Sequence, residues 1–373
     1  MTADSFAPRW AASPSEILRF WLAARGLGPR DLADRTGRSE SWAEDLLGGT
    51  IDIDVDTAYL IAEATSTSPS FWEAAETQFE TDQENVTLDT WCEHMPIKHM
   101  SAMGWIPQAD SWYDSARSAL DFFGVASVAE WNSYYGALIS NARLRSERPG
   151  QTRTPELATW MRACELFAPE VSESYSEDRL RGALEEVRSC VTWPDPARFV
   201  PHIQRTLGRA GVRLAIVRAA PASFLSGAAW HDASGSPIIG LTARGLTDDR
   251  VWFSLYHEAA HILLDPEAAA PFVDELDSST VAGTSSFQDS DDPTSEREAD
   301  TLAVEYLLDD IAKLLDLQGS TLGVREIVRL AAANNTSPGV VVGQLQHLGI
   351  LEFSRRNSLK RRYQWSGSIL GKR

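Results

Sequence analysis

Apolar residues recur at helical spacing over residues 13–80, where glycines separate one apolar group from the next. The spacing predicts short helices over 14–25, 29–36, 40–47, 54–65 and 69–80. Pro14 can occupy the first turn of the first helix, and Ser39 can cap the third. Gly37 can make the turn between the second and third helices. Two short helices joined by a glycine-containing turn are typical of a helix-turn-helix, which we predict as a module over residues 1–85.

The pattern over residues 86–194 is less regular. Amphipathic stretches near 112–145, 154–168 and 177–190 predict a helical connector. His94 and His99 lie close to Cys92 and could form a metal site. Solvated or hydrogen-bonded histidines are the favoured interpretation of this pair.

Residues 195–373 combine strands and helices. Short strands are predicted over 213–218, 227–231 and 237–241, with a hairpin turn between the last two. An apolar helix follows over 248–264, and further helices are predicted over 296–315, 323–334 and 338–348. Residues 274–295 are rich in Ser, Thr and Asp, which predicts a long polar loop. The whole chain is therefore expected to be α+β, with a small antiparallel sheet in its C-terminal part.

Composition adds limits to this picture. The chain has 373 residues, which favours two or three domains, and its net charge is -19. Such a charge disfavours non-specific binding of the whole chain to nucleic acid or anionic membranes. We find no apolar run long enough to span a membrane and no secretory signal. The three widely spaced cysteines predict reduced thiols in a cytoplasmic protein.

The apolar helix over 248–264 contains the sequence His-Glu-Ala-Ala-His at 257–261. His257 and His261 are four residues apart, so both imidazoles project from one helical face and can meet a tetrahedral Zn²⁺. Glu258 lies one position around the helix and is the candidate general base. Because a histidine and a glutamate in a buried helix are costly without partners, a purely structural role for this motif is disfavoured.

A catalytic zinc needs a third protein ligand and an open position. The helix predicted from residue 296 places Glu296 on the side of its apolar face, together with Asp300, whereas Glu298 lies on the wetter side. We therefore expect Glu296 to be the third ligand. Asp300 is expected to accept the distal N–H of a ligating histidine. A solvated acidic helix start is the alternative interpretation of these residues.

The segments RVWFSLYHEAAHILL (250–264) and EREADTLAVEYLL (296–308) resemble the ImmA/IrrE family of metallopeptidase domains. The resemblance extends over roughly residues 195–365. It implies that His257, His261 and Glu296 hold the metal. The family usually has Asn at the position of Asp300, and the Glu-x-x-x-Asp arrangement here is similar to that of thermolysin-like zincins, which makes the site gluzincin-like.

Residues 13–80 resemble the HigA-type, Xre-like helix-turn-helix of antitoxins and regulators, through segments such as SPSEILRFWL and LADRTGRS. The negative net charge of this module argues against DNA binding. Residues 1–85 contain six Arg, no Lys and sixteen Asp or Glu, a net of 6 − 16 = −10. The expected recognition helix carries Glu40, Glu44 and Asp45, which would approach DNA phosphates. We therefore expect a protein-interaction role for the module, with weak or absent DNA binding.

Together these features predict a zinc peptidase that cleaves a protein partner, such as a repressor, an antitoxin or a toxin, within a regulatory switch. A non-enzymatic regulator or antitoxin with a metal-sensing domain is the alternative. His231 could stabilise an oxyanion, although an ordinary strand-end histidine is favoured, and Tyr256, Tyr306 and His347 are favoured as core or boundary residues. The basic residues of the last twenty positions could contact phosphate or form a solvated face that neutralises the acidic chain. The strand 237–241 could be a free sheet edge that takes an extended peptide. The oligomeric state stays open.

Overall fold

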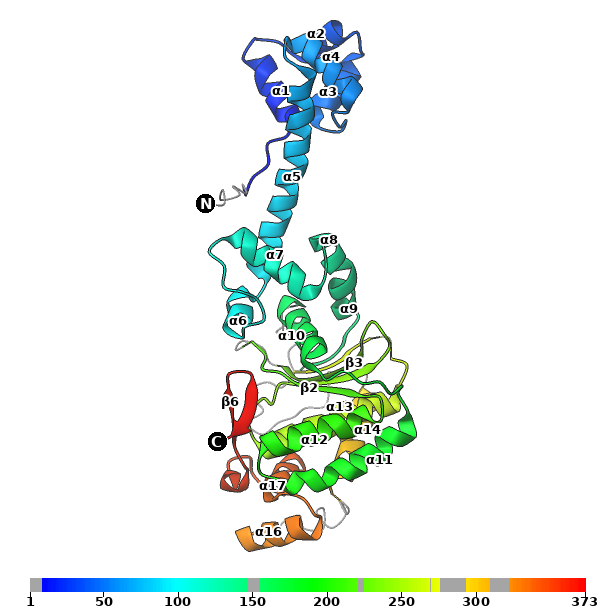
Figure 1. Cartoon of the computed structure of the whole chain (residues 1–373), viewed down its shortest axis with the longest axis vertical. Coiled ribbons are helices and arrows are strands. Elements are labelled where there is room, and N and C mark those ends of the chain that lie inside the picture. Colours follow the sequence, from blue (N-terminus) through cyan, green and yellow to red (C-terminus); the bar gives the residue numbers. More distant parts are fainter. Residues whose placement is uncertain (1–8, 147–153, 221–224, 269, 276–292, 309–321) are drawn as a thin grey trace. The chain divides into compact units, whose positions relative to one another are not determined.

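A computed structural model describes residues 9–146, 154–220, 225–268, 270–275, 293–308 and 322–373. The chain forms two compact units. The N-terminal unit consists of residues 1–95, 108–121 and 126–128, and the C-terminal unit consists of residues 96–107, 122–125 and 129–373. Helices predominate, and the main sheet belongs to the C-terminal unit (Figure 1). The predicted α+β class is confirmed.

The N-terminal unit is helical, and the local sequence determines where its helices begin and end. They are α1 (Pro14–Ala23), α2 (Pro29–Thr36), α3 (Glu40–Gly48), α4 (Val55–Thr65) and α5 (Pro69–His94). Ser13 and Glu16 form a capping box at α1, and Ser39 caps α3 by accepting the Trp42 N–H at 3.1 Å. Gly37 ends α2 at a φ of 66°, a left-handed conformation that glycine adopts without strain. Apolar side chains from all of these helices form one core.

Two predicted helices have different lengths in the structure. Helix α5 was expected over 69–80 but continues to His94, because no glycine or proline interrupts it before Pro96. The predicted amphipathic stretch 112–145 is divided, since Gly124 ends a helix at a φ of 71°. Its parts are α7 (Trp112–Phe123), α8 (Val128–Trp131), the π-helix η1 (Asn132–Gly136) and α9 (Ala137–Ser140).

The C-terminal unit is built around a five-stranded sheet. Its strands are β1 (Arg143–Ser146), β2 (Arg213–Ile216), β3 (Leu225–His231), β4 (Pro237–Leu241) and β5 (Phe272–Glu275), in the order β1-β5-β3-β4-β2. The sheet is mixed and not wholly antiparallel as expected: β3 pairs antiparallel with β4 and β5, whereas β1 pairs with β5 and β2 with β4 in parallel. The sequence correctly predicted the hairpin between β3 and β4, which is antiparallel. The other neighbours are not joined by tight turns, so local sequence does not determine their direction.

Strand β4 is not a free edge, so the proposed use of 237–241 for peptide binding was wrong. It pairs with β2 on one side and with β3 on the other. Its residues Pro237–Leu241 are all buried, which is consistent with an interior strand.

Helices cover both faces of the sheet (Figure 1). Helix α10 (Thr154–Phe167) packs on one face, where Trp160 lies against Gly240 and donates its indole N–H to the Val217 carbonyl at 2.9 Å. Helices α12 (Pro196–Gly208) and α13 (Asp248–Leu264) cover the other face. There the side chain of Glu258 lies against Gly227 of β3.

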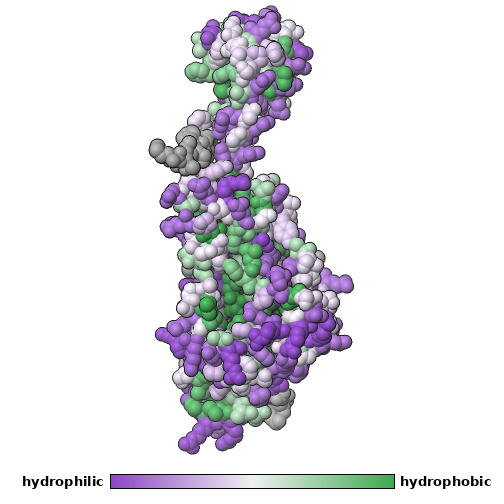
Figure 2. All heavy atoms as spheres, viewed as in Figure 1, coloured by the Kyte–Doolittle hydropathy of each residue, from purple (hydrophilic) through white to green (hydrophobic). Residues whose placement is uncertain are grey.

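The remaining elements of the C-terminal unit are α6 (Ile97–Ala102), α11 (Glu177–Arg188), the 3-10 helix η2 (Ser189–Thr192), α14 (Pro293–Leu307), α16 (Val324–Ala333), α17 (Pro338–His347), η4 (Asn357–Leu359) and the hairpin of β6 (Tyr363–Ser366) and β7 (Ile369–Lys372). Hydrophilic and apolar side chains are mixed on the visible surface (Figure 2). None of the described helices combines the length and hydrophobicity needed to cross a membrane. The three cysteines are buried and none of them forms a disulfide.

Candidate metal centre

Helix α13 is the most buried helix of the candidate site. Its first turn carries Asp248 and Asp249, which favour a helix N-terminus, and neither glycine nor proline interrupts it before Leu264. His257 and Glu258 are 0% exposed and His261 is 1% exposed. The two imidazole Nε2 atoms lie 3.0 Å apart, so the spacing of four residues brings both nitrogens to one point.

Helix α14 brings two of the expected carboxylates to this point. Glu296 places Oε2 3.4 Å from Nε2 of His257 and Oε1 3.5 Å from Nε2 of His261. Asp300, one turn further along, lies with Oδ1 2.9 Å from Nδ1 of His257. Glu298 is exposed, in agreement with the face on which the periodicity of α14 put it.

Asp274 is a member of this cluster that sequence reasoning missed. Its Oδ2 lies 3.3 Å from Nε2 of His257, and its side chain is 9% exposed. The polar composition of 274–295 predicts a loop from residue 274, but this residue lies on strand β5, which pairs with β3. The apolar pair Phe272-Val273 directly before it was the available sign of a short strand.

The spacing of the cluster fits a tetrahedral metal ion. One ligand atom each from His257, His261, Asp274 and Glu296 lies within 4.8 Å of the others. Nitrogen and oxygen ligands about 2.0–2.2 Å from a tetrahedral Zn²⁺ are separated from one another by about 3.3–3.6 Å. The measured separations of 3.0, 3.3, 3.4 and 3.5 Å lie close to that range. Two imidazoles with carboxylates are also a donor set typical of zinc.

The electrostatics of the cluster favour positive charge. Burial by itself would lower the pKa of His257, because it disfavours the charged imidazolium. The carboxylates of Asp274, Asp300 and Glu296 outweigh burial and hold the pKa of His257 well above its usual range. The same three carboxylates would also favour a metal cation at this point.

Glu258 lies beside the cluster under strand β3. A Cβ atom at Gly227 would clash with its Oε1, so the carboxyl group occupies the space that a side chain would take. A register shift between β3 and β5 lies at this same point, between Leu225 and Gly227. The absence of a side chain at Gly227 therefore allows the sheet to pack directly on the carboxyl group of Glu258.

The other sequence candidates lie outside this cluster. His231 ends β3 at the hairpin, four residues beyond Gly227 and about 13 Å further along the strand. The Tyr256 hydroxyl donates to the Leu184 carbonyl at 3.1 Å, and its ring stacks on Tyr306. Among the described residues, Cys92, His94 and His99 do not belong to the group of ligand atoms that could hold a metal ion.

Two basic residues near the C-terminal end, Lys360 and Arg361, have partners inside the fold. The Lys360 ammonium lies 2.6 Å from Oδ2 of Asp249, and both side chains are largely buried. The backbone N–H of Arg361 donates to Oδ1 of Asp248 at 3.0 Å, and the Ser337 hydroxyl donates to its Oδ2 at 2.7 Å. This segment therefore stabilises the first turn of α13.

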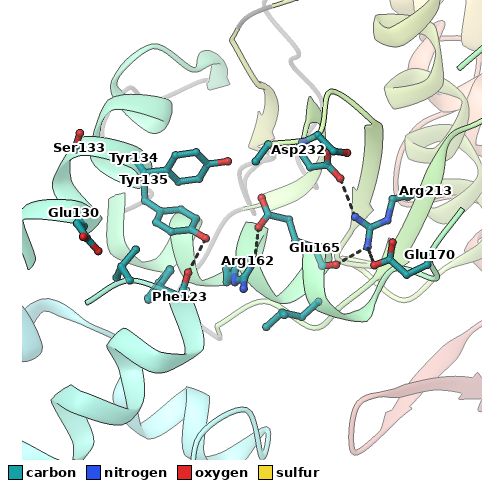
Figure 3. A pocket seen from close by; sticks show the side chains of 15 residues that line it. Phe123, Glu130, Ser133, Tyr134, Tyr135, Arg162, Glu165, Glu170, Arg213 and Asp232 are labelled. Atoms are coloured by element: carbon teal, nitrogen blue, oxygen red, sulfur yellow. Dashed lines mark hydrogen bonds and ion pairs between the residues drawn. The ribbon is translucent and has the colours of Figure 1, made fainter. Parts of the chain in front are cut away.

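A pocket of about 770 Å³ lies among α10, η1 and the β3–β4 hairpin. Figure 3 shows Tyr134 and Tyr135 on one side and Asp232 on the other, with Glu165 between them. Three of its acidic side chains are paired with arginines. Arg162 Nη1 lies 3.1 Å from Glu165, and Arg213 lies 2.9 Å from Asp232 and 3.1 Å from Glu170. We call this group the arginine cluster.

Comparison with known proteins gives one result. Residues 216–342 match the family model of the IrrE N-terminal-like domain, a peptidase family. The matched segment contains α13, β5 and α14, and therefore every residue of the metal-binding cluster. No curated protein and no solved structure gives a significant match. The match supports peptidase chemistry and a metal ion in this part of the chain.

Proposed function

We propose that this protein is a zinc-dependent peptidase that cleaves a protein partner. The observation that carries the proposal is the group of ligand atoms at tetrahedral spacing inside the segment that matches a peptidase family. In this proposal His257, His261 and Glu296 hold the ion, as in gluzincins.

In this proposal Asp300 orients a ligand, whereas His257, His261 and Glu296 bind the ion. Nδ1 of His257 lies 2.9 Å from Oδ1 of Asp300, and donation of its N–H to this carboxylate would select the tautomer whose Nε2 lone pair points at the ion. Zinc bound here would polarise the scissile carbonyl and make a water molecule a better nucleophile at neutral pH. Glu296, from helix α14, is the third ligand, and its two carboxylate oxygens lie 3.4 and 3.5 Å from the Nε2 atoms of His257 and His261.

Glu258 is the proposed general base. It accepts a proton from the water that attacks the peptide carbonyl, and it then gives that proton to the departing amine nitrogen. A glutamine at this position keeps the shape and the hydrogen-bonding reach of the side chain but cannot accept the proton.

The test compares wild type with Glu258→Gln and His257→Ala. Wild type should hold about one zinc per chain by elemental analysis, because its ligand set suffices for one ion. Glu258→Gln should keep the zinc and lose cleavage by about 10²–10⁴-fold. His257→Ala should lose the zinc. Proteomic comparison of cells carrying wild type and Glu258→Gln should reveal the substrate as a protein whose fragments need Glu258. Wild type without bound zinc, or Glu258→Gln with undiminished cleavage, would contradict the proposal.

For the N-terminal unit we propose a helix-turn-helix module, formed by α2 and α3, that recognises protein. The exposed side chains of α3 include Glu40, Glu44 and Asp45, so this surface would repel DNA phosphates. Large apolar side chains of the unit are also exposed, with Phe20 at 79% and Tyr59 at 61%. An acidic surface with apolar groups suits a protein partner, such as the repressor or antitoxin that the peptidase would cleave.

DNA binding by the full chain provides the test of this role. The Glu258→Gln variant should bind the DNA upstream of its own gene with a Kd of about 10⁻⁶ M or weaker, measured by fluorescence anisotropy at about 150 mM salt. A variant with Glu40→Gln, Glu44→Gln and Asp45→Asn should bind more tightly but without sequence preference. Sequence-selective binding by the parent at about 10⁻⁸ M would restore a repressor function.

A further inference from the structure

The metal-binding cluster contains more protein ligands than a catalytic zinc requires. Catalytic zinc sites use three protein ligands and keep one position open, whereas four protein ligands are typical of structural sites. Here His257, His261, Glu296 and Asp274 all reach the same point. If the first three hold the ion, Asp274 takes the position that catalysis needs.

Asp274 lies as close to His257 as Glu296 does. Its carboxylate lies 3.3 Å from Nε2 of His257, and that of Glu296 lies 3.4 Å from the same atom. Phe272, two residues before Asp274 and on the same face of β5, stacks on the imidazole of His261 at 4.3 Å between ring centres. Strand β5 therefore contacts both histidines.

The cluster is also closed to an incoming peptide. Glu258 is 0% exposed, and the side chain of Asp274 is only 9% exposed. A general base must come within hydrogen-bonding distance of the water that attacks the substrate. In this arrangement a peptide carbonyl cannot reach that position until some part of the surrounding structure moves.

Strand pairing identifies the part that holds Asp274 in place. Strand β5 pairs with β3 on one side and with β1 on the other, where Asp274 is in register with Arg145. Strand β1 (Arg143–Ser146) precedes the segment that matches the peptidase family, which begins at residue 216. The position of Asp274 thus depends on backbone pairing with a segment from outside the matched domain.

We propose that Asp274 is a fourth metal ligand that closes the site, and that the arrangement described here is a latent form of the peptidase. Cleavage requires the Asp274 carboxylate to leave the ion, which opens the position for substrate. The pairing of β1 with β5 stabilises the closed form. This inference rests on the proposed zinc site.

The test uses Co²⁺ in place of zinc, because its visible spectrum reports the number and kind of ligands. Wild type, Asp274→Ala and the isosteric Asp274→Asn are loaded with Co²⁺ and titrated with azide, a small anion that binds only at an open position. The matched control is Asp265→Asn, at the C-terminal cap of α13 and outside the cluster. Zinc content is measured for all four proteins.

We expect all four proteins to hold about one metal ion, because the Asp274 variants keep both histidines and Glu296, the set proposed to bind it. Azide should change the Co²⁺ spectrum of the two Asp274 variants but not that of wild type or Asp265→Asn. If the closed form exceeds about nine tenths of the population, cleavage of denatured casein should rise at least about tenfold in the Asp274 variants.

Three results would overturn the inference. An equal response of wild type and Asp274→Asn to azide would show that wild type is already open. Loss of metal from both Asp274 variants would make Asp274 a ligand that the site cannot do without. Absence of metal from all four proteins would refute the proposed zinc site itself, a result distinct from the other two.

Discussion

Two groups of acidic side chains lie on opposite faces of one sheet and have different charge partners. On the α13 face, Asp274, Glu296 and Asp300 surround His257. On the α10 face, the carboxylates of Glu165 and the hairpin residue Asp232 are bound by Arg162 and Arg213 (Figure 3). The first group surrounds an imidazole that can be neutral, and the second is matched by guanidinium groups that are always charged.

The difference shows why acidic side chains alone do not indicate a metal site. In the arginine cluster, Arg213 is 6% exposed and also donates to the carbonyls of Glu165 and Ala168, so its charge is fixed within the fold. In the metal cluster, the histidine nitrogens can give up a proton and bind a cation instead. We therefore expect the arginine cluster to contribute to stability and the metal cluster to metal binding.

Removing Arg213 should have the largest effect on stability and none on metal content. Arg213→Ala leaves the mostly buried Asp232 without its cation, and breaking a buried ion pair costs about 3–5 kcal/mol. The free energy of unfolding of zinc-loaded protein can be measured by urea denaturation. Arg181→Ala, which removes an ion pair with Glu177 between side chains 46% and 48% exposed, is the control and should cost about 0–1 kcal/mol. If Arg213→Ala instead lost zinc with little loss of stability, the proposed division between the two clusters would be wrong.

Asp300→Asn should have an effect smaller than that of Arg213→Ala, and this effect should be confined to metal binding. The amide cannot accept from Nδ1 of His257 as strongly as the carboxylate, so zinc affinity should fall about 10–100-fold. Competition with a chromophoric chelator measures this change. Glu298→Gln, an exposed substitution two residues away on α14, is the control and should leave the affinity unchanged. Equal losses in both variants would mean that only the total acidic charge of α14 matters.

Glu165→Gln should have the smallest effect, visible as a change in pH dependence. Burial raises the pKa of Glu165 above its usual value of 4.5, although Arg162 opposes the shift. The folded state therefore binds more protons than the unfolded state above pH 4.5, and wild type loses stability as the pH rises through this window. Glu165→Gln has no carboxyl group to titrate here. Its free energy of unfolding, measured by urea denaturation and compared with that of wild type, should therefore increase from pH 4.5 upward. A constant difference across that range would mean that Glu165 titrates normally.

The local parts of the metal centre could be predicted from the sequence. Helix α13 has the predicted bounds, because its apolar run is continuous and its histidines are four residues apart. The helical periodicity of α14 also separated Glu296 from Glu298. Both inferences depend on residues within one turn of each other, for which helix geometry is fixed.

The parts that depend on distant pairing could not be predicted. Asp274 reaches His257 only because β5 pairs with β3, and four residues of strand leave a weak pattern beside a polar segment. The interior position of β4 results from parallel pairing with β2, which no turn sequence specifies. The family resemblance also gave no indication of β1, because that strand lies before the matched segment.

The contacts at the first turn of α13 have a consequence for the timing of biosynthesis. Asp248 and Asp249 are buried, and their partners Ser337, Lys360 and Arg361 are made much later, Arg361 being 113 residues beyond Asp248. At about 5–20 residues per second, a ribosome needs about 6–23 s to cover that distance. During this interval the helix that carries His257 and His261 lacks the groups that neutralise and bind its first turn. The first turn of α13 should therefore reach its final stability only after translation has passed residue 361.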